Sequence, residues 1–249
     1  MPRDTSVVLS GATLQTPFAE AYRGLRANVN FTAIGTGVRA ILVTSGASGE
    51  GKSTTVANLA ILLAHAGRRV IVVDADFRRP RLHQLFTTNG HGPHAEGVDG
   101  FGQRTEGDRP RVGLAGLIAG TATFAEVAAA VEGFDNMWLI PAGVIPSNPS
   151  ELLGSEQMRG LVGGLCDRAD VVLLDSPPCA LYADAVALTE ATDGVLYVLK
   201  SGPVGVVNHV RILRQLQQGK ARLLGIVMNQ ADAGASARYG GYHGGAPVA

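Results

Sequence analysis

A glycine-rich stretch near residue 50 has the composition and spacing of a loop that binds phosphate. Residues 46–53 read GASGEGKS and fit the pattern G-x-x-x-x-G-K-[ST], between an apolar run and an amphipathic helix expected from about Ser53 to Ala66. Glycines let backbone N–H groups point at phosphate oxygens, and a helix N-terminus adds partial positive charge. Lys52 can reach the β- and γ-phosphates, and the Ser53 hydroxyl can ligate Mg²⁺. The residues expected to bind the nucleotide are Gly46, Ser48, Gly49, Glu50, Gly51, Lys52, Ser53 and Thr54.

Three carboxylates follow two further apolar runs. Asp74 ends the run Arg69–Asp74 with Asp76 two residues later, and Asp175 ends the run Asp170–Asp175. Ligands of open α/β sheets bind at the carboxyl ends of the strands, so these acids should share one rim with the phosphate loop. An acid at the end of only one of these strands would be read as a common turn residue. Together, beside a phosphate loop, they indicate a site for ATP with Mg²⁺, which prefers oxygen ligands.

The order of the expected elements indicates how these residues are positioned. Runs that are apolar throughout are typical of parallel strands covered by helices on both faces, and the gaps between them accommodate crossover helices. We therefore expect one α/β domain over residues 1–232, with a doubly wound, mainly parallel sheet. The six expected strands are Val38–Ser45, Arg69–Asp74, Met137–Ala142, Asp170–Asp175, Gly194–Lys200 and Leu223–Asn229.

The composition of the 249-residue chain excludes several classes of protein. With 46% hydrophobic and 17% charged residues, the chain is not intrinsically disordered as a whole. Lys plus Arg and Asp plus Glu each number 21, so no net field attracts nucleic acid or anionic lipid. Two cysteines are too few for a disulfide scaffold, the start lacks a secretory signal, and no apolar run approaches the roughly 20 residues of a membrane helix. We expect a reducing, cytoplasmic environment and no nucleic-acid partner.

Three segments lie outside this alternation. A helix is expected over Phe18–Phe31, ahead of the first strand. The polar, Gly-rich insert Thr87–Arg111 is longer than an ordinary connection, and Ala233–Ala249 has the composition of a disordered tail. Neither the histidines of the insert nor the two cysteines form a recognisable ligand set, so no metal or redox role is assigned to His91, His94, Cys166 and Cys179.

On these residues the sequence resembles the bacterial tyrosine kinase family, the P-loop ATPases that regulate capsular and extracellular polysaccharide export. The resemblance rests on the phosphate loop and on D-x-D-x-R-x-P at Asp74–Pro80, D-S-P-P at Asp175–Pro178 and E-x-x-R-x-x-R at Glu20–Arg26. It also includes Pro146–Leu153, where Asn148, Pro149 and Glu151 fit the capped start of a helix. The implied fold is that of the partition-ATPase-like superfamily.

The resemblance assigns roles to the acids. It implies that Asp175 holds Mg²⁺ through water, and that Asp74 and Asp76 contact Mg²⁺ and activate the attacking hydroxyl; either could be the base. Asn229 would contact adenine, although alone it is equally well read as a turn residue. Arg78 either approaches the phosphates or is a solvated cation. The catalytic set is then Lys52, Asp74, Asp76 and Asp175, and the metal set is Ser53, Asp74 and Asp175.

The implied activity is ATP-dependent autophosphorylation of tyrosine in trans, with Tyr239 and Tyr242 of the tail as acceptors. The spacing of Glu20, Arg23 and Arg26 alone indicates a charged helix face, but the family uses this motif to assemble a homo-oligomeric ring. Further implied partners are an integral membrane polysaccharide co-polymerase that acts as activator and a protein tyrosine phosphatase. The kinase would work at the inner face of the cell membrane, through that partner or through a membrane domain missing from this chain.

Two other functions are compatible with a phosphate loop. A partition-type ATPase switch is disfavoured because those relatives carry an extra lysine at the position of Ala47. A scaffold of the export complex could instead bind nucleotide without phosphorylating tyrosine. Dependence of tyrosine phosphate on Lys52 distinguishes the kinase from the scaffold.

Overall fold

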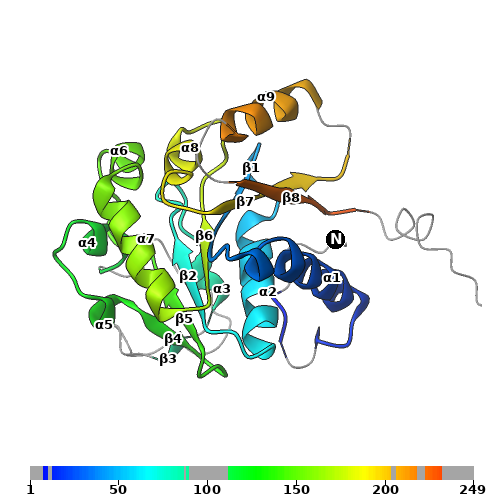
Figure 1. The fold of residues 1–249 in the computed structure, drawn as a ribbon, viewed down its shortest axis with the longest axis horizontal. Helices are drawn as coiled ribbons and strands as arrows, with labels where there is room; N and C mark the ends of the chain where they lie inside the picture. The colour runs from blue at the N-terminus through cyan, green and yellow to red at the C-terminus, as the bar shows by residue number, and fades with distance from the viewer. Residues whose placement is uncertain are drawn as a thin grey trace, which may run out of the picture.

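The computed structural model describes residues 8–10, 13–86, 88–89, 112–202, 206–217 and 222–231. These residues build one eight-stranded sheet in the order β3-β4-β5-β2-β6-β1-β7-β8 (Figure 1). The strands from β5 to β8 in this order are parallel, whereas β4 and β3 extend the sheet antiparallel beyond β5. In chain order the strands are β1 (Ala40–Ser45), β2 (Val70–Asp74), β3 (Thr88–Asn89), β4 (Ala129–Val131), β5 (Met137–Ile140), β6 (Val171–Asp175), β7 (Gly194–Lys200) and β8 (Arg222–Asn229).

Helices cover both faces of the sheet, as the uniformly apolar strands predict. One buried cluster joins the sheet to α1, α2 and α3, and the other joins it to the helices from α4 to α9. Figure 1 shows α2 and α7 on opposite sides of the central strands. The helices are α1 (Pro17–Thr32), the 3-10 turn η2 (Ile34–Thr36), α2 (Lys52–His65), α3 (Leu82–Leu85), α4 (Leu114–Ile118), α5 (Phe124–Val127), α6 (Pro149–Leu153), α7 (Glu156–Arg168), α8 (Asp184–Leu188) and α9 (Val206–Gln217).

The central strands bring the predicted acids to one rim. β6 lies between β1 and β2, and Asp175 is the register partner of Val43 on one side and of Asp74 on the other. Every residue of β1, β2 and β6 is buried, because Val, Ile and Leu on both faces pack against helices. The carboxyl ends of these strands therefore meet where the phosphate loop begins.

The helix after the phosphate loop, α2, is not amphipathic, contrary to the prediction. All residues of α2 except Ser53 and His65 are buried. The sheet covers one side of α2 and α1 covers another, with Tyr22 of α1 fully buried against it. A helix enclosed in this way needs no polar face, so the periodicity of its sequence is weak.

The doubly wound α/β fold is confirmed, and each of the six expected strands forms with its ends within two residues of the prediction. The expected helix over Phe18–Phe31 is α1. The helix at Pro149 begins where predicted, but the Asn148 amide donates to Glu151 Oε2 at 2.8 Å and makes no cap hydrogen bond to the helix backbone. The sequence did not indicate β3, β4 or the short helices α3, α4, α5 and α8. Apart from the two residues of β3, the insert Thr87–Arg111 lies outside the described residues, as does the tail.

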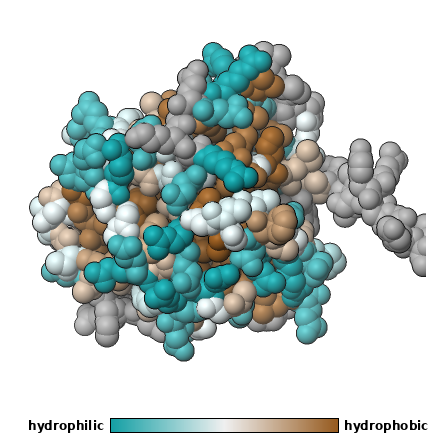
Figure 2. All heavy atoms as spheres, in the orientation of Figure 1, coloured by the Kyte–Doolittle hydropathy of each residue, from teal (hydrophilic) through white to brown (hydrophobic). Residues whose placement is uncertain are grey.

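In the part of the chain that the structure describes, no helix is both long and apolar enough to cross a membrane. The end strand β8 keeps Ile226 and Met228 about half exposed, at 51% and 55%. Figure 2 shows hydrophobic side chains gathered in the area of β8 and α9, among mainly hydrophilic surroundings. This edge of the sheet is therefore partly apolar.

Candidate active site

The phosphate loop joins β1 to α2 through backbone conformations that require glycine. Gly49 and Gly51 have φ values of +80° and +90°, in the left-handed region that side chains with a Cβ rarely adopt. Gly46 is required for space, because a Cβ there would lie 2.7 Å from the Tyr197 hydroxyl and 2.8 Å from the His209 ring. The fixed spacing of these glycines thus follows from the loop geometry.

Lys52 is held inside the loop. Its side chain is only 7% exposed, and Nζ donates to Ser45 Oγ at 3.1 Å. Ser45 Oγ in turn donates to the carbonyl of Ala47 at 2.7 Å. Ser48 is exposed on the loop, whereas Thr54 is buried in the first turn of α2. The ammonium group is therefore positioned before any phosphate arrives.

The Glu50 side chain folds back against the loop instead of projecting toward a ligand. It is 4% exposed, and its Oε2 accepts a hydrogen bond from the Ala47 N–H at 2.8 Å. Its Oε1 accepts a longer one, at 3.4 Å, from the N–H of Lys200 at the end of β7. Within this structure Glu50 shapes the loop, and its own backbone is the part that remains suited to contact phosphate.

The end of β8 closes over the same loop. The Asn229 amide donates to the Glu50 carbonyl at 2.9 Å, and the Gln230 amide donates to the Gly49 carbonyl at 3.1 Å. Asn229 is buried, and its Oδ1 has no hydrogen-bond partner among the described residues. Asn229 is therefore more than a turn residue, because it anchors the loop and offers an unpaired acceptor beside it.

The environment of the Asp175 carboxylate indicates most clearly what the site binds. It is fully buried, and neither of its carboxylate oxygens accepts a hydrogen bond from the residues that the structure describes. Burial raises the pKa of Asp175 to about 7, although the Lys52 charge and the nearby Ser53 hydroxyl oppose this rise. A buried carboxylate without donors is costly, so this group is suited to a cation that compensates it.

Asp74 is the register neighbour of Asp175, but backbone donors already bind its carboxylate. Its Oδ2 accepts from the N–H groups of Arg81 and Leu82 at 3.0 Å each, and its Oδ1 accepts from the Asp76 N–H at 3.3 Å. Burial raises the pKa of Asp74 well above its ordinary value, and the negative charge of Asp175 adds to the rise. Asp74 thus anchors the loop that carries Asp76.

Asp76 has a different environment from Asp74. Its Oδ1 accepts from the backbone N–H groups of Arg78 at 3.1 Å and Arg79 at 2.9 Å, as in an Asx-turn. The residue keeps 7% exposure, whereas Asp74 has none. Of the two acids, Asp76 is the one that a substrate at the rim could reach.

The residues present fit Mg²⁺. Among the described residues no three His, Cys, Asp or Glu side chains converge into a cage made of protein alone. Mg²⁺ is instead usually held by one or two carboxylates with phosphates and water, so a single carboxylate is sufficient. The unpaired oxygens of Asp175, next to Ser53 and Lys52, supply that carboxylate. Asp74 lies beside it with its oxygens already accepting hydrogen bonds.

The Arg78 side chain forms an ion pair that its position in the sequence does not suggest. Its guanidinium binds the buried Asp184 carboxylate, with Nε–Oδ2 and Nη2–Oδ1 distances of 2.9 and 3.0 Å. The Tyr182 ring centroid lies 4.6 Å from the guanidinium carbon. Arg78 is therefore fixed by an ion pair at the rim.

The charged residues of α1 pair within the chain. Arg23 Nη1 binds Glu20 Oε2 at 2.6 Å on the exposed face, and the other Arg23 amino group donates to the Leu14 carbonyl. Arg26 donates to the carbonyl of Leu62, in α2, at 3.3 Å. All three predicted oligomerisation residues thus lie along one side of α1, and Arg26 also ties α1 to α2. Tyr239, Tyr242, His91 and His94 lie outside the described residues.

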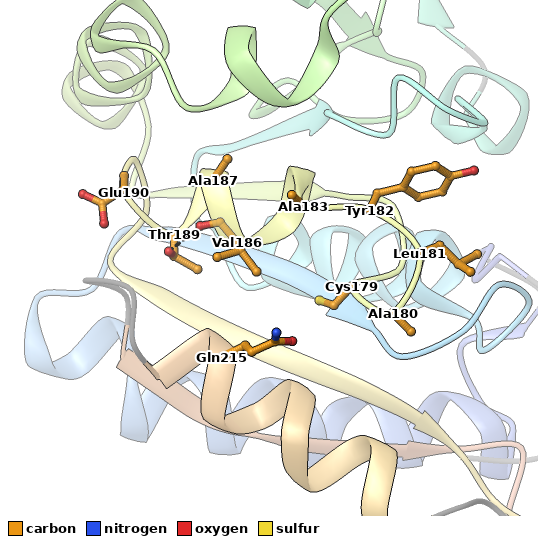
Figure 3. A pocket seen from close by; sticks show the side chains of 10 residues that line it. All are labelled: Cys179, Ala180, Leu181, Tyr182, Ala183, Val186, Ala187, Thr189, Glu190 and Gln215. Carbon is orange, nitrogen blue, oxygen red and sulfur yellow. Dashed lines mark hydrogen bonds between the residues drawn. The ribbon is translucent and has the colours of Figure 1, made fainter.

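A groove of about 630 Å³ lies between α8 and α9, beside the start of the phosphate loop (Figure 3). Cys179 at this groove donates its N–H to the Ser45 carbonyl at 2.8 Å. Burial raises the pKa values of the Cys179 and Cys166 thiols to about 11, so both behave as inert small residues. The residues that line the groove are Cys179, Ala180, Leu181, Tyr182, Ala183, Val186, Ala187, Thr189, Glu190 and Gln215.

Several residues at the site carry no motif that sequence reasoning could use. Ser45 and Tyr197 lie within apolar strand runs, and His209 lies on a helix distant in sequence. Tyr197 and His209 pack behind Gly46, with the tyrosine hydroxyl 2.6 Å from His209 Nδ1. Asp184 is the exception, since an acid shortly after D-S-P-P could have drawn attention.

The chain is similar to known nucleotide-binding proteins over most of its length. Residues 41–239 match the family described as the CobQ/CobB/MinD/ParA nucleotide binding domain. Tyrosine-protein kinase YwqD of Bacillus subtilis is 32% identical over 224 residues, which cover 90% of this chain and 86% of that protein. This relative and the present chain thus correspond nearly end to end.

Two further comparisons extend this result. The putative tyrosine-protein kinase EpsB of Ralstonia solanacearum is 32% identical over 234 residues, which cover 91% of this chain but only 28% of that longer protein. The crystal structure of the chimerical protein CapA2B2 superimposes with a TM-score of 0.78 at 28% identity, covering 93% of this chain and 92% of that one. The matched region therefore makes up nearly all of the CapA2B2 chain but only about a quarter of EpsB.

Proposed function

The chain belongs to the bacterial tyrosine kinases within the CobQ/CobB/MinD/ParA nucleotide-binding family, and from this premise we propose that it transfers the γ-phosphate of ATP to tyrosines of its own C-terminal tail. It is an ATP-dependent protein-tyrosine kinase. Its phosphorylation regulates the polymerisation and export of a capsular or extracellular polysaccharide. The observation that carries the proposal is the buried, unpaired Asp175 carboxylate beside Lys52 and Ser53 at the end of the phosphate loop.

Different residues of the site bind different parts of ATP and its Mg²⁺ ion. The backbone N–H groups of residues 46–54 and the Lys52 ammonium bind the phosphates, and the α2 N-terminus adds its partial positive charge. Ser53 and Asp175 hold Mg²⁺, which neutralises negative charge on the β- and γ-phosphates when bound. Asn229, with its unpaired Oδ1 beside the loop, contacts adenine.

Asp76 is the general base in this proposal, and Asp74 is its support. A tyrosine hydroxyl has a pKa near 10, so its attack gains from a carboxylate that accepts the proton. Both oxygens of Asp74 accept backbone hydrogen bonds in a fully buried position, which leaves it no access to an incoming hydroxyl. Asp76 has one oxygen in the turn and remains at the accessible rim.

The acceptors and partners complete the proposal. Tyr239 and Tyr242 are the phosphorylated residues, and Glu20, Arg23 and Arg26 contact a neighbouring subunit in a homo-oligomeric ring that brings one tail to the next active site. An integral membrane polysaccharide co-polymerase activates the kinase at the inner face of the membrane, and a protein tyrosine phosphatase resets the tail. The match covers only 28% of the longer relative EpsB, which supports the proposal that such a kinase works with further domains or partners.

The experiment is phosphosite mapping by mass spectrometry on the full chain purified from its own host. Parent protein is compared with Lys52→Ala, with Tyr239→Phe plus Tyr242→Phe, and with Lys220→Ala as a lysine control outside the motif. We expect phosphate on Tyr239 or Tyr242 in the parent and the control, and none in Lys52→Ala. Unmodified tails in every sample, with Mg²⁺-dependent ATP hydrolysis intact in the parent, would leave an ATPase switch of the export complex.

A further inference from the structure

An ion pair between the buried Asp184 carboxylate and the partly exposed Arg78 guanidinium joins three segments at the active rim. Asp184, in the first turn of α8, is fully buried. Both of its oxygens accept from Arg78, which follows β2, at 2.9 and 3.0 Å. Ser150 of α6 donates its hydroxyl to Asp184 Oδ1, and the Tyr182 ring lies against the guanidinium. Figure 3 shows Tyr182 at one end of the neighbouring groove.

The geometry of this cluster is specific to an arginine. Burying a carboxylate is costly unless hydrogen bonds satisfy it, and here a guanidinium fork and a hydroxyl do so. A lysine would keep the charge but could not donate to both oxygens from a planar fork or stack on Tyr182 in the same way. The pair thus fixes the direction of the Arg78 side chain as well as its charge.

Arg78 also sets the orientation of Asp76. The backbone N–H groups of Arg78 and Arg79 bind Asp76 Oδ1, so a shift of Arg78 would move the carboxylate. The other end of this loop is held by Asp74, which binds three backbone N–H groups including that of Asp76. Asp76 is therefore clamped between the sheet on one side and Asp184 on the other.

We propose that Asp184 and Arg78 are positioning residues, whose ion pair holds Asp76 in the orientation that phosphoryl transfer needs. The inference rests on the proposed function, in which Asp76 accepts the tyrosine proton. It also gives Pro146–Leu153 a role, because this stretch delivers Ser150 to Asp184 and packs α6 against α8. Neither Asp184 nor Arg78 contacts the nucleotide in this scheme.

The test compares Asp184→Asn, Arg78→Lys and Arg78→Ala in the full chain purified from its own host. The matched control is Asp170→Asn, which removes an Arg–Asp pair at the amino ends of β2 and β6, far from the active rim, where Arg69 Nη2 lies 2.9 Å from Asp170 Oδ1. The measurements are kcat and KM for ATP in tyrosine phosphorylation, and the Kd of Mg·ADP.

A misplaced catalytic group costs on the order of 10²-fold in rate, so Asp184→Asn should lose about that factor in kcat with the Kd of Mg·ADP nearly unchanged. Arg78→Lys should recover part of the loss of Arg78→Ala, and Asp170→Asn should keep the parent kcat.

Several outcomes would overturn the inference. Full kcat in Asp184→Asn would show that the pair does not position Asp76. Equal losses in kcat and in Mg·ADP affinity would indicate a merely structural role. If Asp184→Asn fails to fold by circular dichroism, Ser150→Ala decides the question with the same split between kcat and Kd. If even the parent phosphorylates no tyrosine, the proposed function fails separately. The comparison then uses ATP hydrolysis, in which Asp76 would orient water, and equal rates in parent and Asp184→Asn overturn the positioning role.

Discussion

The substitution Asp175→Asn should stabilise the ligand-free protein and abolish its phosphoryl transfer activity. The pKa of Asp175 rises from an ordinary value of 3.8 to about 7, chiefly because the carboxylate is buried. At about 1.4 kcal/mol for each pKa unit, ionised Asp175 costs the folded state about 4 kcal/mol at pH 8. An unpaired buried amide has its own cost of about 1–3 kcal/mol, so the net gain should be about 1–3 kcal/mol.

The sign of the pH dependence follows from the direction of the shift. Because the folded pKa exceeds the unfolded one, the stabilising contribution of this group is present below pH 3.8 and is lost as the pH rises through about 7. The advantage of Asp175→Asn over the parent should therefore be largest near pH 8.5 and should shrink by more than half toward pH 5. Removing the Asp175 charge also relieves Asp74, whose pKa it raises, so both effects have the same sign.

The assay is urea unfolding of parent and variant from pH 5 to 8.5, with nucleotide and Mg²⁺ removed by a chelator. Asp170→Asn is the control at the other end of β6, because Arg69 lowers the pKa of Asp170 and this substitution should destabilise the protein at pH 8. Mg·ADP should then stabilise the parent and not Asp175→Asn. An Asp175→Asn protein that is less stable than the parent at pH 8, or a difference independent of pH, would refute the reasoning.

Three further predictions concern neighbouring groups. Gly46→Ala should lower the free energy of unfolding by about 1–3 kcal/mol and weaken Mg·ADP binding in calorimetry, because its Cβ would meet Tyr197; an unchanged Kd would contradict this. Asp76→Asn should reduce kcat by about 10²–10⁴-fold in a phosphotransfer assay with the melting temperature nearly unchanged, and a stronger effect of Asp74→Asn on kcat at equal stability would reverse the assignment. Cys179, with a thiol pKa of about 11, should resist iodoacetamide at pH 8 in the native state and react only on unfolding, as judged by mass spectrometry.

Sequence patterns predicted the fold through the strands that helices cover on both sides. Those strands are apolar throughout, and the acids at their ends, Asp74 and Asp175, needed only the rule that ligands bind at the carboxyl ends of parallel strands. The short strands β3 and β4 were not predictable, because two or three residues at a sheet edge carry too little periodicity. The amphipathic interpretation of α2 was wrong because contact with α1 removes the need for a polar face.

Within the site, sequence reasoning identified residue types but not how each carboxylate is used. Asp74 and Asp76 are equivalent in the pattern D-x-D, and only the backbone donors around them separate an anchored acid from an accessible one. Glu50 looked like part of a nucleotide contact, yet its carboxylate closes the loop on itself. The partner of Arg78 lies 106 residues away, so no local spacing could reveal that ion pair.

The two ends of strands β2 and β6 differ in how their acids are compensated, and this difference locates the function. At the amino ends, Asp170 accepts hydrogen bonds from both the backbone and the guanidinium of Arg69, at 2.8 and 2.9 Å. At the carboxyl ends, Asp74 and Asp175 are neighbours in register, and the Asp175 oxygens have no hydrogen-bond partner in the described part of the chain. Stability alone would favour compensation at both ends, since the same two strands provide similar positions. The unpaired Asp175 carboxylate therefore reflects selection for binding a cation and phosphate, and the stability gained by Asp175→Asn would measure what that selection costs the fold.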